Sequence, residues 1–302
     1  MVNKERLPHI ITAVSFVVFI VLGLACATSS DIPAPPPPSG PQLDGEIPAE
    51  AGISLVERLN WLQNNAQNNT KYTLEINADE IITQQQFLFR DRNNITIILK
   101  GIGANHILSL SNTVTNSMFT VVVSNTLILE NITLRGHSST TEALIVVPGK
   151  LIMNSGATIT GNDACGVEVY TLGKMIGKFE MNSGATITGN NSPGVTVRGA
   201  FIMNGGTISN NTVTRGNGGG VCVIPGGSFT MNDGNITGNT ALGTDRNNLS
   251  EGRGGGVYVM TASVFDMNGG TISENRASFE SGGVYMLGGG RRPAGTISGN
   301  TP

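Results

Sequence analysis

From residue 151 to the C-terminus, apolar and polar residues alternate in short blocks that recur along the chain. Each block reads Phe-x-Met-Asn, with Leu instead of Phe in the first copy. Because side chains of a strand point alternately to opposite faces, the first and third residues of each block are expected to point inward. The blocks begin at Leu151, Phe179, Phe201, Phe229 and Phe265. The expected inward methionines are Met153, Met181, Met203, Met231 and Met267.

Two further apolar patterns follow in each block. An Ile flanked by polar residues predicts a second short strand, and Gly-Val-x-Val predicts a third. Strands of three or four residues are too short for independent sheets, but they can stack in parallel on the next coil about 4.8 Å away. The pattern therefore predicts an all-β fold, a parallel β-helix with three short strands per coil, in which no coil is stable alone.

Upstream of the regular blocks, similar apolar runs recur less evenly. We therefore expect irregular coils over residues 70–150 and regular repeats over 151–302. The capping-box sequence Ser54-Leu-Val-Glu57 predicts a short helix that covers the open end of the first coil. The β-helix domain would then span residues 51–302. The apolar face of the helix would consist of Leu55, Leu59 and Leu62.

An Asn follows the Met of every block. These asparagines are expected to lie at the same corner of successive coils, where stacked amides can hydrogen-bond into a ladder. A role in contacting a ligand is the alternative. The ladder would consist of Asn154, Asn182, Asn204, Asn232 and Asn268.

The coils differ in length at one place, between the end of the second strand and the start of the third. The chain takes five residues from Asn162 to Val167 but eighteen from Asn239 to Val257. Long loops cost little extra closure entropy, so the insertions need no function to explain them. All of them leave from one corner, however, which is the usual place for a solenoid's variable binding surface. Two interpretations therefore remain: an edge that binds a ligand, or a row of loops that are only solvated. The charged loop residues are Arg215, Asp245, Arg246, Glu251, Arg253 and Arg276.

The outward positions of the third strands form a file that ends in two tyrosines. Tyr258 and Tyr285 fall on consecutive coils, so their rings are expected about 4.8 Å apart on an exposed sheet. Such a pair could contact a sugar or a protein. Aromatic packing that only stabilises the last coils is the alternative. The candidate binding patch consists of Tyr258, Tyr285, Arg246, Arg253 and Arg276.

The N-terminal segment predicts export. Lys4 and Arg6 precede an apolar run over residues 10–24, which is typical of a signal peptide and gives an expected peptide over 1–25. An uncleaved membrane anchor is the alternative.

The residues that follow the apolar run indicate a lipid anchor. Leu22-Gly-Leu-Ala-Cys26 resembles the lipobox of bacterial lipoproteins, although Gly23 stands where that motif has Leu. The resemblance implies lipidation of Cys26 and attachment to a bacterial membrane, the outer membrane or cell surface. The Pro-rich residues 26–50 would form a stiff tether between lipid and domain.

Composition limits the kinds of partner and cofactor that we expect for the chain. The chain of 302 residues has a formal net charge of -3 and 13% charged residues, so it has no basic footprint for nucleic acid. Cys165 and Cys222 would lie two coils apart, roughly 9.6 Å, which is beyond the reach of a disulfide. Outside the N-terminal segment the histidines are His106 and His137. This set gives no metal-ligand cluster, and we expect no cofactor.

An enzyme that acts on polysaccharides is the main alternative class. Glycoside hydrolysis needs two carboxylates about 5 to 9.5 Å apart. Glu180 and Asp266 share one outward file, but three coil steps would separate them by roughly 14 Å. No Asp cluster suited to the calcium of a lyase appears in the sequence. The residues therefore favour a protein that is not an enzyme.

The repeat motifs support a family comparison. Phe-x-x-Asn and Gly-Gly-Val are similar to the repeats of polymorphic membrane protein adhesins, and the chain more broadly resembles pectin-lyase-like right-handed β-helix lipoproteins. The resemblance covers about residues 151–300. The Gly-Gly-Val motifs begin at Gly219, Gly255 and Gly282.

The resemblance carries expectations about fold and function. It implies a right-handed β-helix that is displayed at the cell surface and binds a glycan or a host or matrix protein. Those adhesins are held by a C-terminal autotransporter barrel, whereas attachment here is expected to depend on Cys26. A polysaccharide lyase or hydrolase of the same superfamily, and a lipoprotein that serves only as coat or spacer, are the alternatives.

Overall fold

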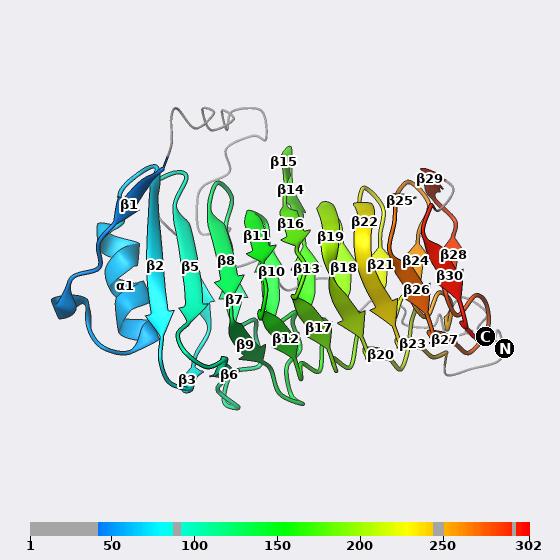
Figure 1. Ribbon diagram of the computed structural model, residues 1–302, viewed down its shortest axis with the longest axis horizontal. Coiled ribbons are helices and arrows are strands. Elements are labelled where there is room, and N and C mark those ends of the chain that lie inside the picture. The colour runs from blue at the N-terminus through cyan, green and yellow to red at the C-terminus, as the bar shows by residue number, and fades with distance from the viewer. Residues whose placement is uncertain (1–41, 87–91, 244–250, 292–293) are drawn as a thin grey trace, which may run out of the picture. The chain divides into compact units, whose positions relative to one another are not determined.

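A computed structural model describes residues 42–302, apart from 87–91, 244–250 and 292–293. These described residues all belong to one compact unit. Within its described part the chain winds through about nine turns of parallel β-solenoid, with one short α-helix at the first coil (Figure 1). The all-β parallel β-helix expected from the repeats is therefore confirmed.

Each regular coil contributes a first, a second and a third strand, and like strands of successive coils pair in parallel and in register. We call the three resulting surfaces the first, second and third sheets. The turn after the first strand is the first corner, the turn after the second strand is the second corner, and the turn that leads into the next coil is the third corner.

First strands are β2 (Thr70–Ile76), β5 (Thr96–Gly101), β8 (Thr126–Glu130), β11 (Lys150–Met153), β16 (Lys178–Met181), the first halves of β19 (Ala200–Ser209) and β22 (Ser228–Thr237), β25 (Val264–Met267) and β29 (Gly289–Arg291). Second strands are β3 (Glu80–Ile82), β6 (His106–Leu110), β9 (Ile132–Arg135), β12 (Thr158–Thr160), β17 (Thr186–Thr188), the second halves of β19 and β22, β26 (Thr271–Ser273) and β30 (Thr296–Ser298). Third strands are β4 (Gln85–Gln86), β7 (Phe119–Thr120), β10 (Ile145–Val147), β13 (Val167–Val169), β18 (Val195–Val197), β21 (Val221–Val223), β24 (Val257–Val259) and β28 (Val284–Met286).

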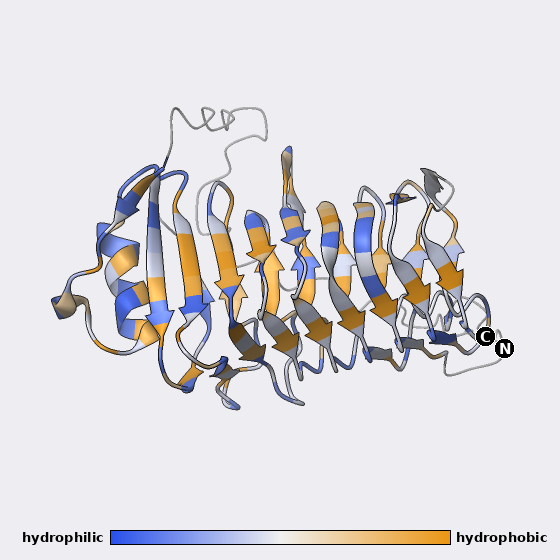
Figure 2. Ribbon diagram, in the orientation of Figure 1, coloured by the Kyte–Doolittle hydropathy of each residue, from blue (hydrophilic) through white to orange (hydrophobic). Residues whose placement is uncertain are grey.

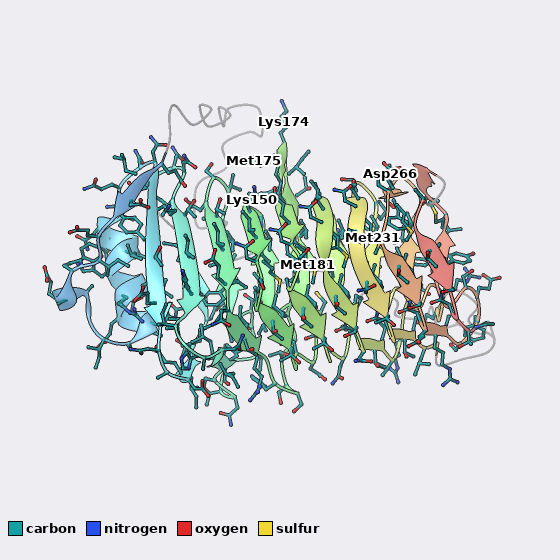
Figure 3. All side chains as sticks on the ribbon, in the orientation of Figure 1. Lys150, Lys174, Met175, Met181, Met231 and Asp266 are labelled. Carbon is teal, nitrogen blue, oxygen red and sulfur yellow. The ribbon has the colours of Figure 1, made fainter. Side chains whose placement is uncertain are left out.

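The interior consists of files of identical residues. Met181, Met203 and Met231 pair directly across successive coils and are fully buried, as the alternation predicts. Phe179, Phe201, Phe229 and Phe265 stack with ring centroids 4.6, 4.7 and 4.8 Å apart. Figure 2 shows the apolar residues concentrated on the strands, and Figure 3 labels two of the interior methionines. Burial of these side chains, on the order of 1.5 to 3 kcal/mol each, stabilises the stack.

Two coils differ from the expected separate strands. In β19 and β22 the first and second strands run together through the first corner, with a register shift near Asn204. The corner is one residue shorter there: four positions separate Met203 from Thr207, whereas five separate Met153 from Thr158.

The N-terminal cap forms as the capping box predicts. Helix α1 (Leu55–Asn65) begins after Ser54, whose hydroxyl accepts from the backbone N–H of Glu57 at 3.3 Å. The Glu57 carboxylate accepts from the backbone N–H of Ser54 at 3.0 Å, and this bond is the main cause that lowers the pKa of Glu57. The helix buries Leu55, Leu59 and Leu62 on the first coil.

Part of the expected tether belongs to the domain. Strand β1 (Leu43–Gly45) pairs in parallel with β2, and the 3-10 turn η1 (Ala49–Ala51) follows it. Lys71 and Asp44 form an ion pair at 2.8 Å, and the side chain of Gln42 donates to the carbonyl of Asn94 at 2.7 Å. These contacts hold residues that the Pro-rich composition assigned to the linker.

Two insertions leave the regular coil. At the second corner, β20 (Thr212–Val213), β23 (Thr240–Ala241) and β27 (Arg276–Ala277) form a small three-stranded parallel sheet. At the third corner, β14 (Thr171–Leu172) and β15 (Met175–Ile176) form an antiparallel hairpin that projects beyond the neighbouring turns (Figure 1). The sequence patterns above predicted neither element.

Candidate functional site

The outward file of the third sheet has the composition and order that the repeats predict. Thr196 pairs with Cys222, Cys222 with Tyr258, and Tyr258 with Tyr285 on successive coils. The two tyrosine rings are stacked, with centroids 5.7 Å apart and an interplanar angle of 8°. The structure therefore brings together the aromatic part of the candidate binding patch.

Tyr258 is not an exposed ring. It is only 6% exposed, so the expectation of two open aromatic faces is wrong for this residue. Burial is the main cause that raises the pKa of its hydroxyl. Tyr285 in the next coil remains partly exposed. A ligand could therefore contact only the surface around Tyr285, because the two rings do not form a flat exposed platform.

Arg253 completes this cluster. Its guanidinium carbon lies 4.9 Å from the centroid of the Tyr285 ring, within cation–π range. Its Nε lies 2.9 Å from a carboxylate oxygen of Glu280. The backbone N–H of Arg253 donates to the side-chain oxygen of Asn217 at 2.8 Å, which ties two neighbouring loops together. Tyr285, Arg253 and Glu280 therefore form an ordered aromatic and charged group at the second corner.

The remaining arginines of the patch are placed differently. Arg276 opens β27 and its side chain is exposed on the second corner. Arg215 is also exposed there. Arg246 and Asp245 lie outside the described residues. We call the described second-corner residues 212–220, 240–243, 251–256 and 276–283, together with Tyr285 beside them on β28, the loop edge.

Upstream in the same outward file, the groups are more enclosed. Burial raises the pKa of Glu168, an effect that the nearby Arg198 opposes and Glu142 reinforces. Burial also raises the pKa of Cys222 to about 12 and that of Cys165 further. Both cysteines are free thiols, as expected from their spacing. Their thiolates are scarce at neutral pH, so neither has the character of a nucleophile.

The five asparagines of the first corner are joined by side-chain hydrogen bonds. Each Nδ2 donates to the Oδ1 of the preceding coil at 2.8 to 3.1 Å, and Asn154 donates in turn to Glu130. The amides lie at the surface, exposed or half-buried. We call Asn154, Asn182, Asn204, Asn232 and Asn268 the outer ladder.

A second ladder, which the sequence patterns did not predict, lies inside the second corner. Its members from Asn162 to Asn275 are buried, and the last, Asn300, is half-buried. The asparagines from Asn190 to Asn275 each donate through both the backbone N–H and Nδ2 to the Oδ1 of the next coil, whereas Asn162 does so through its backbone N–H alone. The residue before each asparagine has positive φ, as Gly161 does at 70°. The Gly-Asn pairs were the available signal. We call Asn162, Asn190, Asn211, Asn239, Asn275 and Asn300 the inner ladder.

Groups that could support catalysis are dispersed. Glu180 lies 2.8 Å from Lys150 in an ion pair, and three coil steps separate it from Asp266. Among the described residues no group of three or more His, Cys, Asp or Glu side chains could hold a metal ion. An open cleft of about 290 Å³ lies elsewhere, beside the N-terminal cap, where Arg58 donates to the carbonyl of Glu75.

The expected signal peptide and Cys26 lie outside the described residues. Among the helices that the structure does describe, none has the length and apolar character to cross a membrane.

Comparison with known protein families identifies the fold family of the chain. The model of a family described as a right-handed β-helix region matches residues 142–301, more than half of the chain. No curated protein and no solved structure matches. The matched region covers the regular coils, the loop edge and both ladders, and the family includes both enzymes and proteins that are not enzymes.

Proposed function

The chain belongs to the right-handed β-helix family, and from that premise we propose that it is a displayed binding protein of the adhesin type. Its ligand is a glycan or a protein of a host or matrix, and the loop edge contacts it. Export depends on the N-terminal segment, and a lipid on Cys26 holds the domain at the outer membrane or cell surface.

The observation that carries this proposal is the construction of the loop edge. The loops differ in length, yet each leaves the coil directly after a buried asparagine of the inner ladder. The short strands β20, β23 and β27 then stack in register, so the bases of the loops are fixed. Variable loops on a rigid support are the usual arrangement of a binding surface on a repeat scaffold.

The chemistry at this edge suits recognition. Tyr285 and Arg253 are of the residue types that dominate binding energy at interfaces, and Arg253 is held in place by Glu280. Arg276 adds an exposed cation on the adjacent corner. A binding role is favoured over polysaccharide cleavage because the outward carboxylates Glu180 and Asp266 are three coils apart.

The binding proposal is tested with the full chain on glycan arrays and on immobilised matrix proteins. Tyr285→Ala and Arg276→Ala should each raise the dissociation constant of the identified ligand roughly tenfold or more, which is the effect of losing one strong contact. Tyr170→Ala and Arg135→Ala are the matched controls, since both residues lie away from the loop edge. Equal binding by all four folded variants would contradict the proposal.

The alternatives give distinct outcomes in the same assays. Release of shortened products from a uronate polymer would identify an enzyme of the pectin-lyase-like superfamily. Neither binding nor turnover, with the protein abundant at the surface, would favour a structural coat.

The anchor is tested separately. Mass spectrometry of the membrane fraction should find a diacylglyceryl-modified N-terminus at Cys26, and Cys26→Ser should remove it. Protease added to intact cells should digest the domain. Protection until lysis would contradict surface display without bearing on whether the loop edge binds a ligand.

A further inference from the structure

The hairpin β14–β15 is the most prominent departure from the coil and does not take part in the stack. Thr171 pairs with Ile176 and Leu172 with Met175 across a turn at Gly173, where φ is 61°. The Thr171 hydroxyl donates to the carbonyl of Arg198 at 2.6 Å, and the N–H of Gly177 donates to the carbonyl of Tyr170 at 3.1 Å. The base of the hairpin is therefore held to the domain while its tip stands clear.

The tip is apolar and exposed. Leu172 is 44% exposed and Ile176 is 57% exposed. Residues directly opposite on a hairpin share a face, so Leu172 and Met175 lie on one face and Ile176 on the other. Both faces of the tip thus carry apolar side chains, and a flat protein partner would cover only one of them.

Charge along the same corner has one sign. Lys174 stands at the tip, as Figure 3 shows, and Lys178 is exposed at the base. The third-corner turns between residues 121 and 289, all within the described part, contain no Asp or Glu. The loop edge differs, because Glu280 is exposed there. The hairpin corner consequently complements an anionic surface.

The neighbouring turns extend this surface. Val264, which opens β25 directly after the third corner of a later coil, is 42% exposed. The third-corner turns between contain small or apolar residues such as Ile224 and Pro225. Because coils stack in register, these turns form a row beside the hairpin. A row of weakly polar turns with one apolar, cationic projection suits a planar partner.

We propose that the hairpin inserts its tip into an anionic lipid surface, with Leu172 and Ile176 in the interfacial region and Lys174 and Lys178 at the phosphate groups. Apolar side chains beside lysines are the combination that binds lipid interfaces. The second and third corners are different corners of a triangular coil, so this contact turns the loop edge away from the membrane. The insertion does not depend on the function proposed for that edge.

Fluorescence of the full chain tests the insertion. The sequence has one tryptophan, Trp61, so Trp61→Phe gives a background in which Leu172→Trp reports from the tip. Ile81→Trp is the matched control, since Ile81 is 77% exposed on β3, away from the hairpin. Each variant is mixed with vesicles of brominated phosphatidylcholine, with or without phosphatidylglycerol as the anionic lipid.

The expected result is a blue shift and loss of most emission for Leu172→Trp with the anionic vesicles, and little change for Ile81→Trp. Adding Lys174→Glu and Lys178→Glu should lower the bound fraction roughly fivefold or more per charge. Ile176→Trp is a second reporter should Leu172→Trp fail to keep the β-sheet circular dichroism of the parent.

Three results would overturn the proposal. The first is no quenching at either hairpin position, and the second is equal quenching at positions 172 and 81, which would reflect adhesion through the N-terminal segment alone. The third is a blue shift without vesicles that grows with protein concentration, which would assign the hairpin to contact between copies of the chain.

Discussion

The two asparagine ladders use the same amide groups in different surroundings. Asn204 of the outer ladder is exposed and has one side-chain bond to each neighbouring rung. Asn211 of the inner ladder is fully buried, and its N–H and Nδ2 both donate to Oδ1 of Asn239, at 3.1 and 2.9 Å. Water can replace the bonds of the outer ladder, whereas the inner ladder is buried from Asn162 to Asn275.

This difference bears on function because loops of every length begin at the inner ladder. From the ladder asparagine to the third strand the chain takes five residues after Asn190 and eighteen after Asn239. The buried amides fix the point of departure in each coil, so insertions alter the loop edge without displacing the stack. The outer ladder supports no insertion of this kind, and its corner is short in every regular coil.

Removal of an inner rung should give the largest effect. Asn211→Ala deletes the acceptor of the Asn190 N–H and Nδ2 and removes the side-chain donor to the carbonyl of Ile187. Each buried polar group left without a partner costs about 1 to 3 kcal/mol, so the free energy of unfolding should fall by about 3 kcal/mol or more. Urea denaturation followed by far-UV circular dichroism measures the change. A loss below about 1 kcal/mol would show that the interior amides do not stabilise the stack.

The matched substitution in the outer ladder should cost far less. Asn204→Ala removes the bonds to Asn182 and Asn232, but both neighbours are close to solvent and can bind water. We expect a loss of about 0.5 to 1 kcal/mol in the same denaturation experiment. A loss equal to that of Asn211→Ala would remove the distinction between the ladders.

The outward file of the third sheet has no asparagine ladder, and a substitution of its residue Glu168 should have the smallest effect on stability. The pKa of Glu168 is raised above its ordinary value of 4.5, so the folded state favours the protonated carboxyl. The stability contributed by this group is therefore greatest at low pH and falls as pH rises from about 4.5 through the raised value.

Glu168→Gln removes that titration. Relative to the parent, the variant should be more stable at pH 7 than at pH 4, although loss of the attraction to Arg198 offsets part of the gain. Thermal melts at both pH values measure the difference. A difference independent of pH would contradict the account of an enclosed carboxyl.

Much of the fold could be predicted from single-residue periodicity. Alternation placed Phe179 and Met181 inside, and the capping box at Ser54 gave the helix, because both features depend on local rules. The register of Tyr258 on Tyr285 followed from the repeat alone.

Features that depend on the chain's exact path at the corners could not be predicted in this way. The Gly-Asn pairs were visible, but whether Asn190 points inward depends on the positive φ of Gly189 before it. Tyr258 is buried by neighbours that alternation does not reveal. The hairpin had a local signal, Gly173-Lys174 between Thr171-Leu172 and Met175-Ile176, that the coil pattern obscured.

The buried amides of the inner ladder, from Asn190 to Asn275, are held by one another and fix the coils beneath the loop edge. Hydrogen exchange of the side-chain NH₂ groups, followed by nuclear magnetic resonance, tests this arrangement most directly. The Nδ2 protons of Asn190, Asn211 and Asn239 should exchange only when the core unfolds. Those of Asn182 and Asn204 should exchange rapidly. Rapid exchange at all five positions would contradict the account.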